Sequence, residues 1–253
     1  MSFRKQSGFT LIELSLVIVI IGLIVAGVTA GQSLVRSSKL RSVITDKDKY
    51  VAAINTFKLE YNALPGDLQT ASSYFSGSLN GNGNGLIDYT GANAESLQAW
   101  VHLARAGLIS GTYTGTGASL NFAYGTNAPI TNLTSTYMGW VIYAQSAASY
   151  YGLTFTGNIL NLGGYRYPYS TTPATARHVG GTMTAREGQS IDVKIDDGNP
   201  AGGQFIQQRD TGSAAPYDTS CVDQNIGTGT TSNTSYVYDN YYSCRLLFFL
   251  NKR

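Results

Sequence analysis

Cysteine, histidine and charged residues are scarce in this chain of 253 residues. It contains two Cys and two His, and only 13% of its residues are charged. A zinc site with four Cys or His ligands therefore cannot be built within one chain unless carboxylates complete it. The Gly-x-Ser-x-Gly motif of a nucleophile elbow is also absent. We therefore expect no catalytic site and no required cofactor, and interpret the chain as a protein that is not an enzyme.

The apolar content excludes a disordered chain, because 43% of the residues are hydrophobic and 11% are aromatic. Charge is unevenly placed: residues 1–65 hold eight basic and four acidic residues, whereas residues 66–253 hold nine and eleven. The larger C-terminal part thus lacks the basic excess of a nucleic-acid-binding surface. No nucleic-acid partner is expected.

An apolar run begins close to the N-terminus. Residues 9–30 contain a single charged residue, Glu13, and Arg4 and Lys5 precede the run. At about 1.5 Å per helical residue, this run spans the roughly 30 Å hydrocarbon core of a membrane. The positive-inside rule places the short N-terminus in the cytoplasm and the rest of the chain outside. One interpretation is a signal peptide that is cleaved after Ala30, and another is a plain membrane anchor. Both leave Glu13 unexplained, because inserting a carboxylate into the membrane costs about 2.5–3.5 kcal/mol.

The segment Gly8-Phe9-Thr10-Leu11-Ile12-Glu13-Leu14 resembles the processing motif of type IV prepilins and of type II secretion pseudopilins. The resemblance implies cleavage after Gly8 by a prepilin peptidase, methylation of the new Phe9 amine, and retention of the apolar segment. It also implies that Glu13 pairs with the terminal amine of a neighbouring subunit during assembly. Such a pair neutralises a carboxylate in lipid at one axial register, and so fixes the stagger between helices.

The resemblance implies a structural subunit of a type IV pilus-like or type II secretion pseudopilus filament. Its partners would be copies of itself, other pilin-like subunits, the peptidase, an inner-membrane assembly platform and membrane lipid. The subunit would first sit in the inner membrane with its head in the periplasm or outside, and then in a filament. The alternative is a membrane-anchored or secreted monomeric protein whose head binds a ligand.

We expect one long helix after the leader. Apolar residues from Val43 to Tyr61 recur at steps of three and four, and no proline occurs before Pro65. A single helix from Phe9 to Tyr61 would be about 80 Å long; the alternative is a membrane helix followed by a separate short one. The predicted organisation is a leader at 1–8, a helix at 9–62 with a transmembrane and assembly segment at 9–30, and a head at 66–253.

The head is expected to combine helices with an antiparallel sheet, which gives an α+β, pilin-like fold. Asp67 is interpreted as the cap of a short helix through Phe75, and a second helix is predicted at 94–106, between Asn93 as N-cap and Gly107 as C-cap. Thr184 and Glu187 fit a capping box, although a hairpin built on Asp197-Gly198 is the alternative nearby. Strands are predicted at 119–124, 138–145, 153–156, 159–162 and 246–250.

A calcium site is one interpretation of the loop that carries Asn80, Asn82, Asn84, Leu86 and Asp88. Its pattern copies the first nine positions of a calcium loop, in which Leu86 would offer its carbonyl. Position twelve is Gly91 instead of Glu, and three Asn replace Asp, so weak affinity or a plain flexible turn is the alternative. A second acidic cluster, Asp192, Asp196 and Asp197, is interpreted as a solvated helix end or as a calcium site.

The two cysteines, Cys221 and Cys244, have 22 residues between them. A compartment outside the cytoplasm permits a disulfide, and closing a loop of that length contributes about 3 kcal/mol by restricting the unfolded chain. We predict a structural disulfide that attaches the last strand to the head, with free thiols as the alternative.

Overall fold

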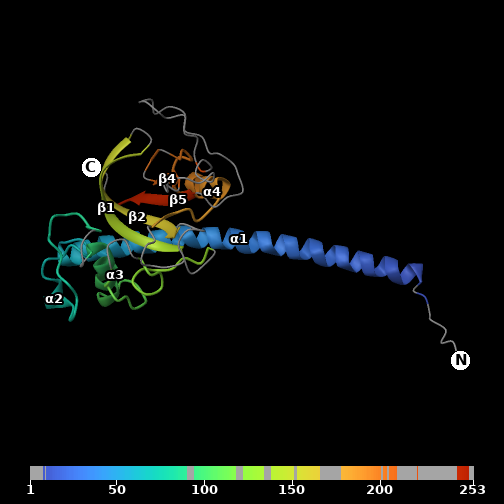
Figure 1. The fold of residues 1–253 in the computed structure, drawn as a ribbon, viewed down its shortest axis with the longest axis horizontal. Helices are drawn as coiled ribbons and strands as arrows, with labels where there is room; N and C mark the ends of the chain where they lie inside the picture. Colours follow the sequence, from blue (N-terminus) through green and yellow to red (C-terminus); the bar gives the residue numbers. More distant parts are fainter. Residues whose placement is uncertain are drawn as a thin grey trace. The chain divides into compact units, whose positions relative to one another are not determined.

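The computed structural model describes residues 8, 10–89, 94–117, 122–133, 138–150, 153–165, 178–200, 202–203, 205–209, 221 and 244–250. The chain divides into two compact units, residues 1–40 and residues 41–253. Helix α1 (Leu11–Tyr61) contributes to both units and is continuous over 51 residues (Figure 1). The prediction of a single long helix is therefore confirmed, and the alternative of two separate helices is wrong.

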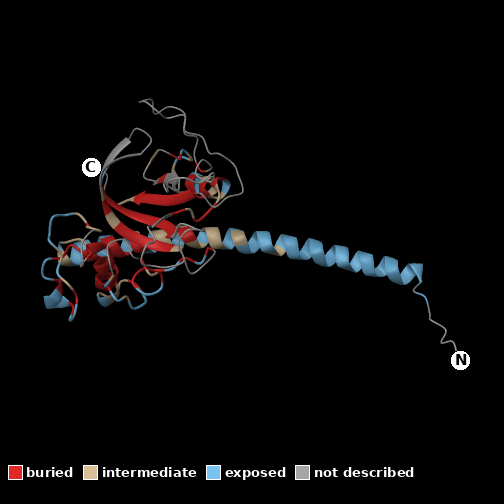
Figure 2. Cartoon of the chain, viewed as in Figure 1, coloured by how far each residue is buried: buried red, intermediate tan, exposed pale blue. Residues whose placement is uncertain are grey.

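The apolar side chains of α1 in the first unit are exposed to solvent. Large apolar side chains remain accessible from Leu11, at 88% exposure, to Leu34, at 72% (Figure 2). In water such a surface is unfavourable, by about 25 cal/mol for each Å² of apolar area. This helix is long and apolar enough to cross a membrane.

The second unit is built around an antiparallel sheet with the strand order β1-β2-β5-β4, and β3 pairs with β2 beside that path. Within the described residues, three shorter helices accompany the sheet. The strands are β1 (Met138–Tyr150), β2 (Leu153–Tyr165), β3 (His178–Gly180), β4 (Phe205–Arg209) and β5 (Cys244–Phe249), and the helices are α2 (Ala71–Tyr74), α3 (Glu95–Arg105) and α4 (Ala185–Ile195). Together with α1, these elements form the predicted α+β, pilin-like fold.

One face of the sheet packs against the second half of α1. Trp140 on β1 contacts Tyr50 of α1, with ring centroids 5.7 Å apart, and Tyr50 also meets Trp100 of α3 at 5.1 Å. All three side chains are buried. Their aromatic edges meet ring faces, a geometry that adds about 0.5–1.5 kcal/mol for each pair beyond the buried area. The predicted packing of the amphipathic half of α1 against the sheet is confirmed.

The opposite face of the sheet has its own apolar cluster. Ile159, Ile206 and Leu247 come from β2, β4 and β5, and Tyr143 and Phe249 pack against them. Successive side chains of a strand point to opposite faces, so neighbouring strand residues serve the two clusters alternately. Helix α4 contacts β4 and β5 (Figure 1).

Several predicted boundaries in the head change. The short helix is α2, with Thr70 at its N-cap, so Asp67 does not cap it. The two strands predicted at 153–156 and 159–162 are one continuous strand, β2. Among the described residues 122–124 of the strand predicted at 119–124, only Tyr124 forms a bridge, with Ala128. Asn93 lies outside the described residues.

The C-terminal end of α3 and the start of α4 follow the predicted signals, whereas the N-cap of α3 is Ala94 instead of the predicted Asn93. Gly107 follows the end of α3 with a φ of +71°, the left-handed conformation that terminates helices. Thr184 and Glu187 form the predicted capping box at the start of α4. Because α4 runs to Ile195, the alternative hairpin built on Asp197-Gly198 is wrong. The last strand begins at Cys244 and ends at Phe249, close to its predicted range.

His102 of α3 forms a hydrogen bond with the segment that follows α1. Its Nδ1 accepts a hydrogen bond from the Gly66 N–H at 2.9 Å, and its Nε2 faces the Leu79 carbonyl at 3.2 Å. The ring stacks on Phe57 of α1, with centroids 6.0 Å apart. Burial lowers the pKa of His102 to about 4, and the nearby Arg105 charge adds to that shift. The neutral ring is therefore the form that fits this site.

Stability should fall as acid protonates His102. Its pKa is about 6.5 unfolded and about 4 folded, so the unfolded chain binds the proton first and the contribution is complete only above pH 6.5. Between pH 6.5 and 4 we expect a loss of roughly 3 kcal/mol, at 1.36 kcal/mol for each pKa unit. Denaturant titration of the detergent-solubilised chain, followed by fluorescence of Trp100 and Trp140, measures it.

The control for this prediction is His102→Asn, which keeps an acceptor for the Gly66 N–H but does not titrate. Burial raises the pKa of Asp67 and of Glu95, which acts in the opposite direction at acid pH and is common to both proteins. The difference between wild type and variant should therefore shrink as pH falls from 6.5 to 4. An unchanged difference would show that His102 does not cause the acid loss.

Candidate functional site

The predicted processing and assembly residues lie at the start of α1. Gly8 is exposed, and Phe9 lies outside the described residues. The backbone N–H of Thr10 donates to Glu13 Oε2 at 2.9 Å, and the Thr10 hydroxyl donates to the same oxygen at 2.8 Å. The Glu13 N–H in turn donates to Thr10 Oγ1 at 3.3 Å. Thr10 and Glu13 thus satisfy each other as a capping box at the N-terminus of the helix.

This arrangement gives the carboxylate two donors from its own chain. A carboxylate near a helix N-terminus also meets the positive end of the helix dipole, which favours its charged form. Around it, Leu11, Ile12 and Leu14 are exposed and apolar. Glu13 is therefore a single acidic group on an apolar surface, held in place by Thr10. A role for Glu13 was predicted from the sequence but a role for Thr10 was not, although the Thr-x-x-Glu spacing is the signal of a capping box.

Replacing Thr10 by Val should loosen the first turn of α1. The variant keeps the shape of the side chain but loses the hydroxyl that caps the helix, at a cost of about 1 kcal/mol. Amide hydrogen exchange at Glu13 and Leu14, whose N–H groups donate to Thr10, should accelerate about fivefold, since 1.4 kcal/mol corresponds to tenfold. Thr10→Ser retains the hydroxyl and should exchange like the wild type. Equal exchange in both variants would contradict the capping role.

The loop at residues 80–88 is organised by two buried carboxylates from outside it. Asp67 accepts backbone N–H bonds from three consecutive loop residues, at 2.6 Å, 3.1 Å and 2.8 Å: Gly83, Asn84 and Gly85. Glu95, in the first turn of α3, accepts from the N–H groups of Asn82 and Asp88 at 2.7 Å and 2.9 Å. Burial, together with the charge of Asp88, raises the pKa of both carboxyls, although the N–H donors counteract this shift.

The side-chain oxygens of the predicted calcium ligands accept hydrogen bonds within the protein. Asn80 Oδ1 accepts from the Ser72 N–H, and the Oδ1 atoms of Asn82 and Asn84 accept from N–H groups two residues further on. Asp88 Oδ2 accepts from the side-chain amides of Asn82 and Asn84 at 2.9 Å and 3.1 Å. The structure thus brings the side chains of Asn82 and Asn84 together at Asp88. Calcium binding by Asn80, Asn82, Asn84, Leu86 and Asp88 stays a prediction.

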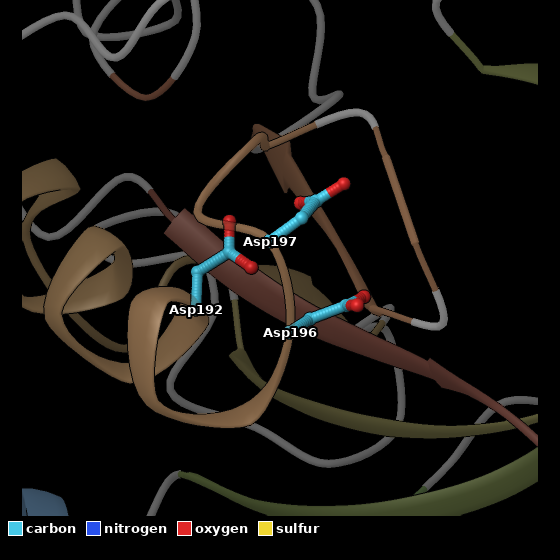
Figure 3. Close-up of side chains that lie close together, drawn as sticks. All are labelled: Asp192, Asp196 and Asp197. Carbon is cyan, nitrogen blue, oxygen red and sulfur yellow. The ribbon is translucent and has the colours of Figure 1, made fainter.

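The second acidic cluster lies at the C-terminal end of α4 (Figure 3). Each of Asp192, Asp196 and Asp197 offers a carboxylate oxygen, and these oxygens lie within 4.8 Å of one another. Asp192 is buried, whereas Asp197 is exposed. The Asp196 N–H donates to the Asp192 carbonyl, and Asp197 Oδ1 accepts from the Asn199 N–H. The cluster is therefore a helix end that is only partly solvated, and calcium binding there stays a prediction.

Cys221 and Cys244 form a disulfide, as predicted. Cys244 is the first residue of β5 and is also bridged to Met183 through backbone hydrogen bonds. The bond attaches residue 221 to the start of β5, a strand that lies between β2 and β4, so its role is structural. The described residues contain no free cysteine.

The N-terminal residues 3–29 match the family model of the prokaryotic N-terminal methylation motif. No curated protein and no solved structure matches the chain. The matched segment includes Gly8, Thr10 and Glu13 and most of the exposed apolar half of α1. Proteins with this motif are structural subunits that are synthesised as precursors. The chain therefore carries the leader of a type IV prepilin-like precursor at its N-terminus.

Proposed function

We propose that the chain is a structural subunit of a filament, either a type IV pilus-like fibre or a type II secretion pseudopilus. The observation that carries this proposal is the pairing of the methylation motif with a continuous, exposed apolar helix. A leader followed by an apolar segment alone would also fit an exported or anchored monomer. A retained helix with one acidic residue near its start additionally supplies a contact between subunits.

Assembly in this proposal follows from the chemistry of Glu13. Cleavage after Gly8 creates a new ammonium group on Phe9, and methylation leaves it positively charged. In an apolar environment, a carboxylate and an ammonium from two neighbouring helices attract each other strongly and stabilise only the stagger at which they meet. The exposed leucine, isoleucine and valine side chains of α1 then pack against those of neighbouring helices. The heads, residues 66–253, would form the outside of the filament.

The proposed partners follow from the same steps. A prepilin peptidase removes residues 1–8, an inner-membrane assembly platform extracts the subunit, and further pilin-like subunits join it. The proposed location before assembly is the inner membrane, with the N-terminus in the cytoplasm and the head outside. We propose no catalytic activity for the head.

The amino-terminal residue of the cellular protein tests this proposal. Protein isolated from cell envelopes and from sheared surface material should begin at Phe9 and carry one methyl group on its amine, measured by mass spectrometry of the N-terminal peptide. A chain beginning at Gly31 would instead identify an exported monomer, the alternative in which the head binds a ligand. A chain beginning at Met1 would identify an unprocessed anchor.

Gly8→Ala provides the matched variant for this measurement, because it changes only the residue before the cleavage site. We expect the uncleaved chain to accumulate in the membrane and to be missing from sheared material. Sheared filaments that contain uncleaved subunits would contradict the proposal that the Phe9 amine is required for assembly.

A further inference from the structure

Three asparagines in the loop at residues 80–88 are each followed by a glycine. The pairs are Asn80-Gly81, Asn82-Gly83 and Asn84-Gly85. Asparagine is chemically labile in such a pair, because glycine has no Cβ atom to hinder its own backbone nitrogen. That nitrogen can attack the side-chain amide carbon of the preceding residue. All three asparagines are exposed, so burial does not exclude the water that completes the reaction.

The reaction is deamidation through a cyclic imide. A bond forms between the glycine nitrogen and the asparagine Cγ atom, the Cγ–Nδ2 bond breaks, and the side-chain nitrogen leaves as ammonia with the proton of the backbone N–H. Water then opens either of the two C–N bonds of the imide ring, which gives aspartate or isoaspartate. Nothing is oxidised or reduced, and the reaction consumes only water.

The fold requires glycine in two of these pairs, so the labile bonds are part of the loop. Gly83 and Gly85 have φ angles of +73° and +81°, a region that other residues rarely adopt. Conversion would also damage the loop. Asn82 and Asn84 each donate from Nδ2 to Asp88 Oδ2, and an aspartate in either place would bring a second carboxylate against Asp88. Isoaspartate would in addition lengthen the backbone by one methylene group.

The backbone nitrogens that would attack Asn82 and Asn84 are both bonded to Asp67. The Gly83 N–H donates to Asp67 Oδ1 at 2.6 Å, and the Gly85 N–H donates to Oδ2 at 2.8 Å. Each nitrogen gives up this proton when it attacks, so the hydrogen bond is lost before the imide forms. A carboxylate is itself too weak a base to remove an amide proton. The contact with Asp67 therefore slows the attack.

A second set of hydrogen bonds acts in the opposite direction. The Oδ1 atoms of Asn82 and Asn84 accept backbone N–H bonds, which polarise the two side-chain carbonyl groups and favour attack on them. These donors and acceptors are uncharged, whereas the bonds to Asp67 have a charged acceptor and are about twice as strong. The protective contact is therefore the larger effect.

We propose that Asn82 and Asn84 are latent deamidation sites, and that the Asp67 carboxylate suppresses their conversion to aspartate and isoaspartate in the folded head. Asn80 lacks this protection, because the Gly81 N–H donates to a neutral backbone carbonyl at 2.9 Å. Conversion of Asn82 and Asn84 is thus confined to heads that have not folded. The proposal does not depend on filament assembly.

The experiment follows the three asparagines in the full chain during incubation in mildly alkaline buffer. Peptide mass spectrometry measures the converted fraction at each site, and chromatography separates aspartate from isoaspartate. In denaturant the three sites should convert at similar rates, because each is followed by glycine. In the folded, detergent-solubilised chain, Asn82 and Asn84 should convert at least about tenfold more slowly than in denaturant, the factor expected from one hydrogen bond to a charged group. Equal rates in the folded and denatured chains would overturn the proposal.

Asp67→Asn separates the two protected sites. Oδ1 of Asp67 accepts two of the three loop N–H bonds, so the amide oxygen of the variant should take the Oδ1 position and keep the bond from Gly83. The amide nitrogen then faces Gly85 and cannot accept its N–H. The ratio of Asn84 to Asn82 conversion should therefore rise about fivefold over the wild type, the factor expected from one neutral hydrogen bond.

This ratio distinguishes the loss of one contact from a general loss of structure. Both sites lie in one chain, so unfolding of the loop would accelerate Asn82 and Asn84 alike and leave their ratio at the wild-type value. An unchanged ratio in Asp67→Asn would therefore overturn the proposal, whether both sites accelerate or neither does. Asp48→Asn is the matched control, because it removes the charge of an exposed carboxylate on α1, and it should leave the rates at all three sites unchanged.

Discussion

Replacing Glu13 by Ala should reduce filament assembly by at least about a hundredfold. Removing one partner of a desolvated ion pair leaves the other charge unpaired, which costs about 3–5 kcal/mol and corresponds to two or more powers of ten. The unpaired charge here is the Phe9 amine of the neighbouring subunit. The measurement is the quantity of subunit in sheared surface filaments, relative to the quantity in the membrane.

Membrane insertion should respond in the opposite direction, which separates assembly from anchoring. A carboxylate within an apolar span costs about 2.5–3.5 kcal/mol, so Glu13→Ala should remain in the membrane at least as well as the wild type. Glu13→Asp retains the charge on a shorter side chain and should assemble to an intermediate level. Filaments formed by Glu13→Ala in wild-type quantity would refute the pairing mechanism.

Two controls show whether a loss of filaments in Glu13→Ala comes from assembly, and not from processing or from unfolding of the head. Leader removal and methylation of Phe9 should persist, because Gly8 is unchanged, and mass spectrometry checks both. The head should remain folded, and fluorescence reports on it alone because both tryptophans, Trp100 and Trp140, lie in the second unit.

The features that sequence predicted well depend on neighbours along the chain. The length of α1 follows from a run of helix-compatible residues that no proline interrupts before Pro65. The capping box of Thr184 and Glu187 is a contact over three residues, and it fixed the start of α4 correctly. These signals are local, so no knowledge of the tertiary fold was needed.

The features that sequence missed depend on distant contacts. Among the described strands, β4 pairs only with β5, which follows it after a long intervening segment. Residues 205–209 alone therefore give no sign of a strand. Asp67 is of a residue type that caps helices and lies just before a short helix. Its carboxylate instead accepts hydrogen bonds from the backbone N–H groups of Gly83, Asn84 and Gly85. These hydrogen bonds to a distant loop take the place of the expected capping bond, and the sequence near Asp67 does not indicate them.

Gly66 shows why Asp67 can make these bonds. Its φ is +89°, and a Cβ atom at this position would collide with the backbone carbonyl of Glu95. Pro65 and Gly66 thus bring the chain into direct contact with α3 and place the Asp67 carboxylate within hydrogen-bonding distance of residues 83–85. A Pro-Gly pair indicates a turn from the sequence alone, but the close approach to α3 that requires a glycine here depends on the tertiary fold.

Replacing Asp67 by Ala should lower the free energy of unfolding of the head by about 2–4 kcal/mol. Asp67 is 3% exposed, and its removal leaves the N–H groups of Gly83 and Gly85 without an acceptor, each at about 1–2 kcal/mol, whereas the Asn84 N–H keeps Asn82 Oδ1. The cost of burying the carboxylate, which raises its pKa, is recovered and favours the lower end of this range. Denaturant titration followed by tryptophan fluorescence at pH 7 measures the change.

Asp67→Asn tests which of the three bonds matter. Its amide oxygen can keep the bonds that Oδ1 accepts from Gly83 and Asn84, whereas its amide nitrogen cannot accept from Gly85, which donates to Oδ2. We expect a loss of about 1–2 kcal/mol, the cost of one unsatisfied donor. Asp48→Ala removes an exposed carboxylate paired with Lys47 and should change stability by less than about 1 kcal/mol. Equal losses in Asp67→Ala and Asp48→Ala would show that the loop does not depend on the Asp67 carboxylate, and residues 80–88 would then need another source of order, such as the predicted calcium ion.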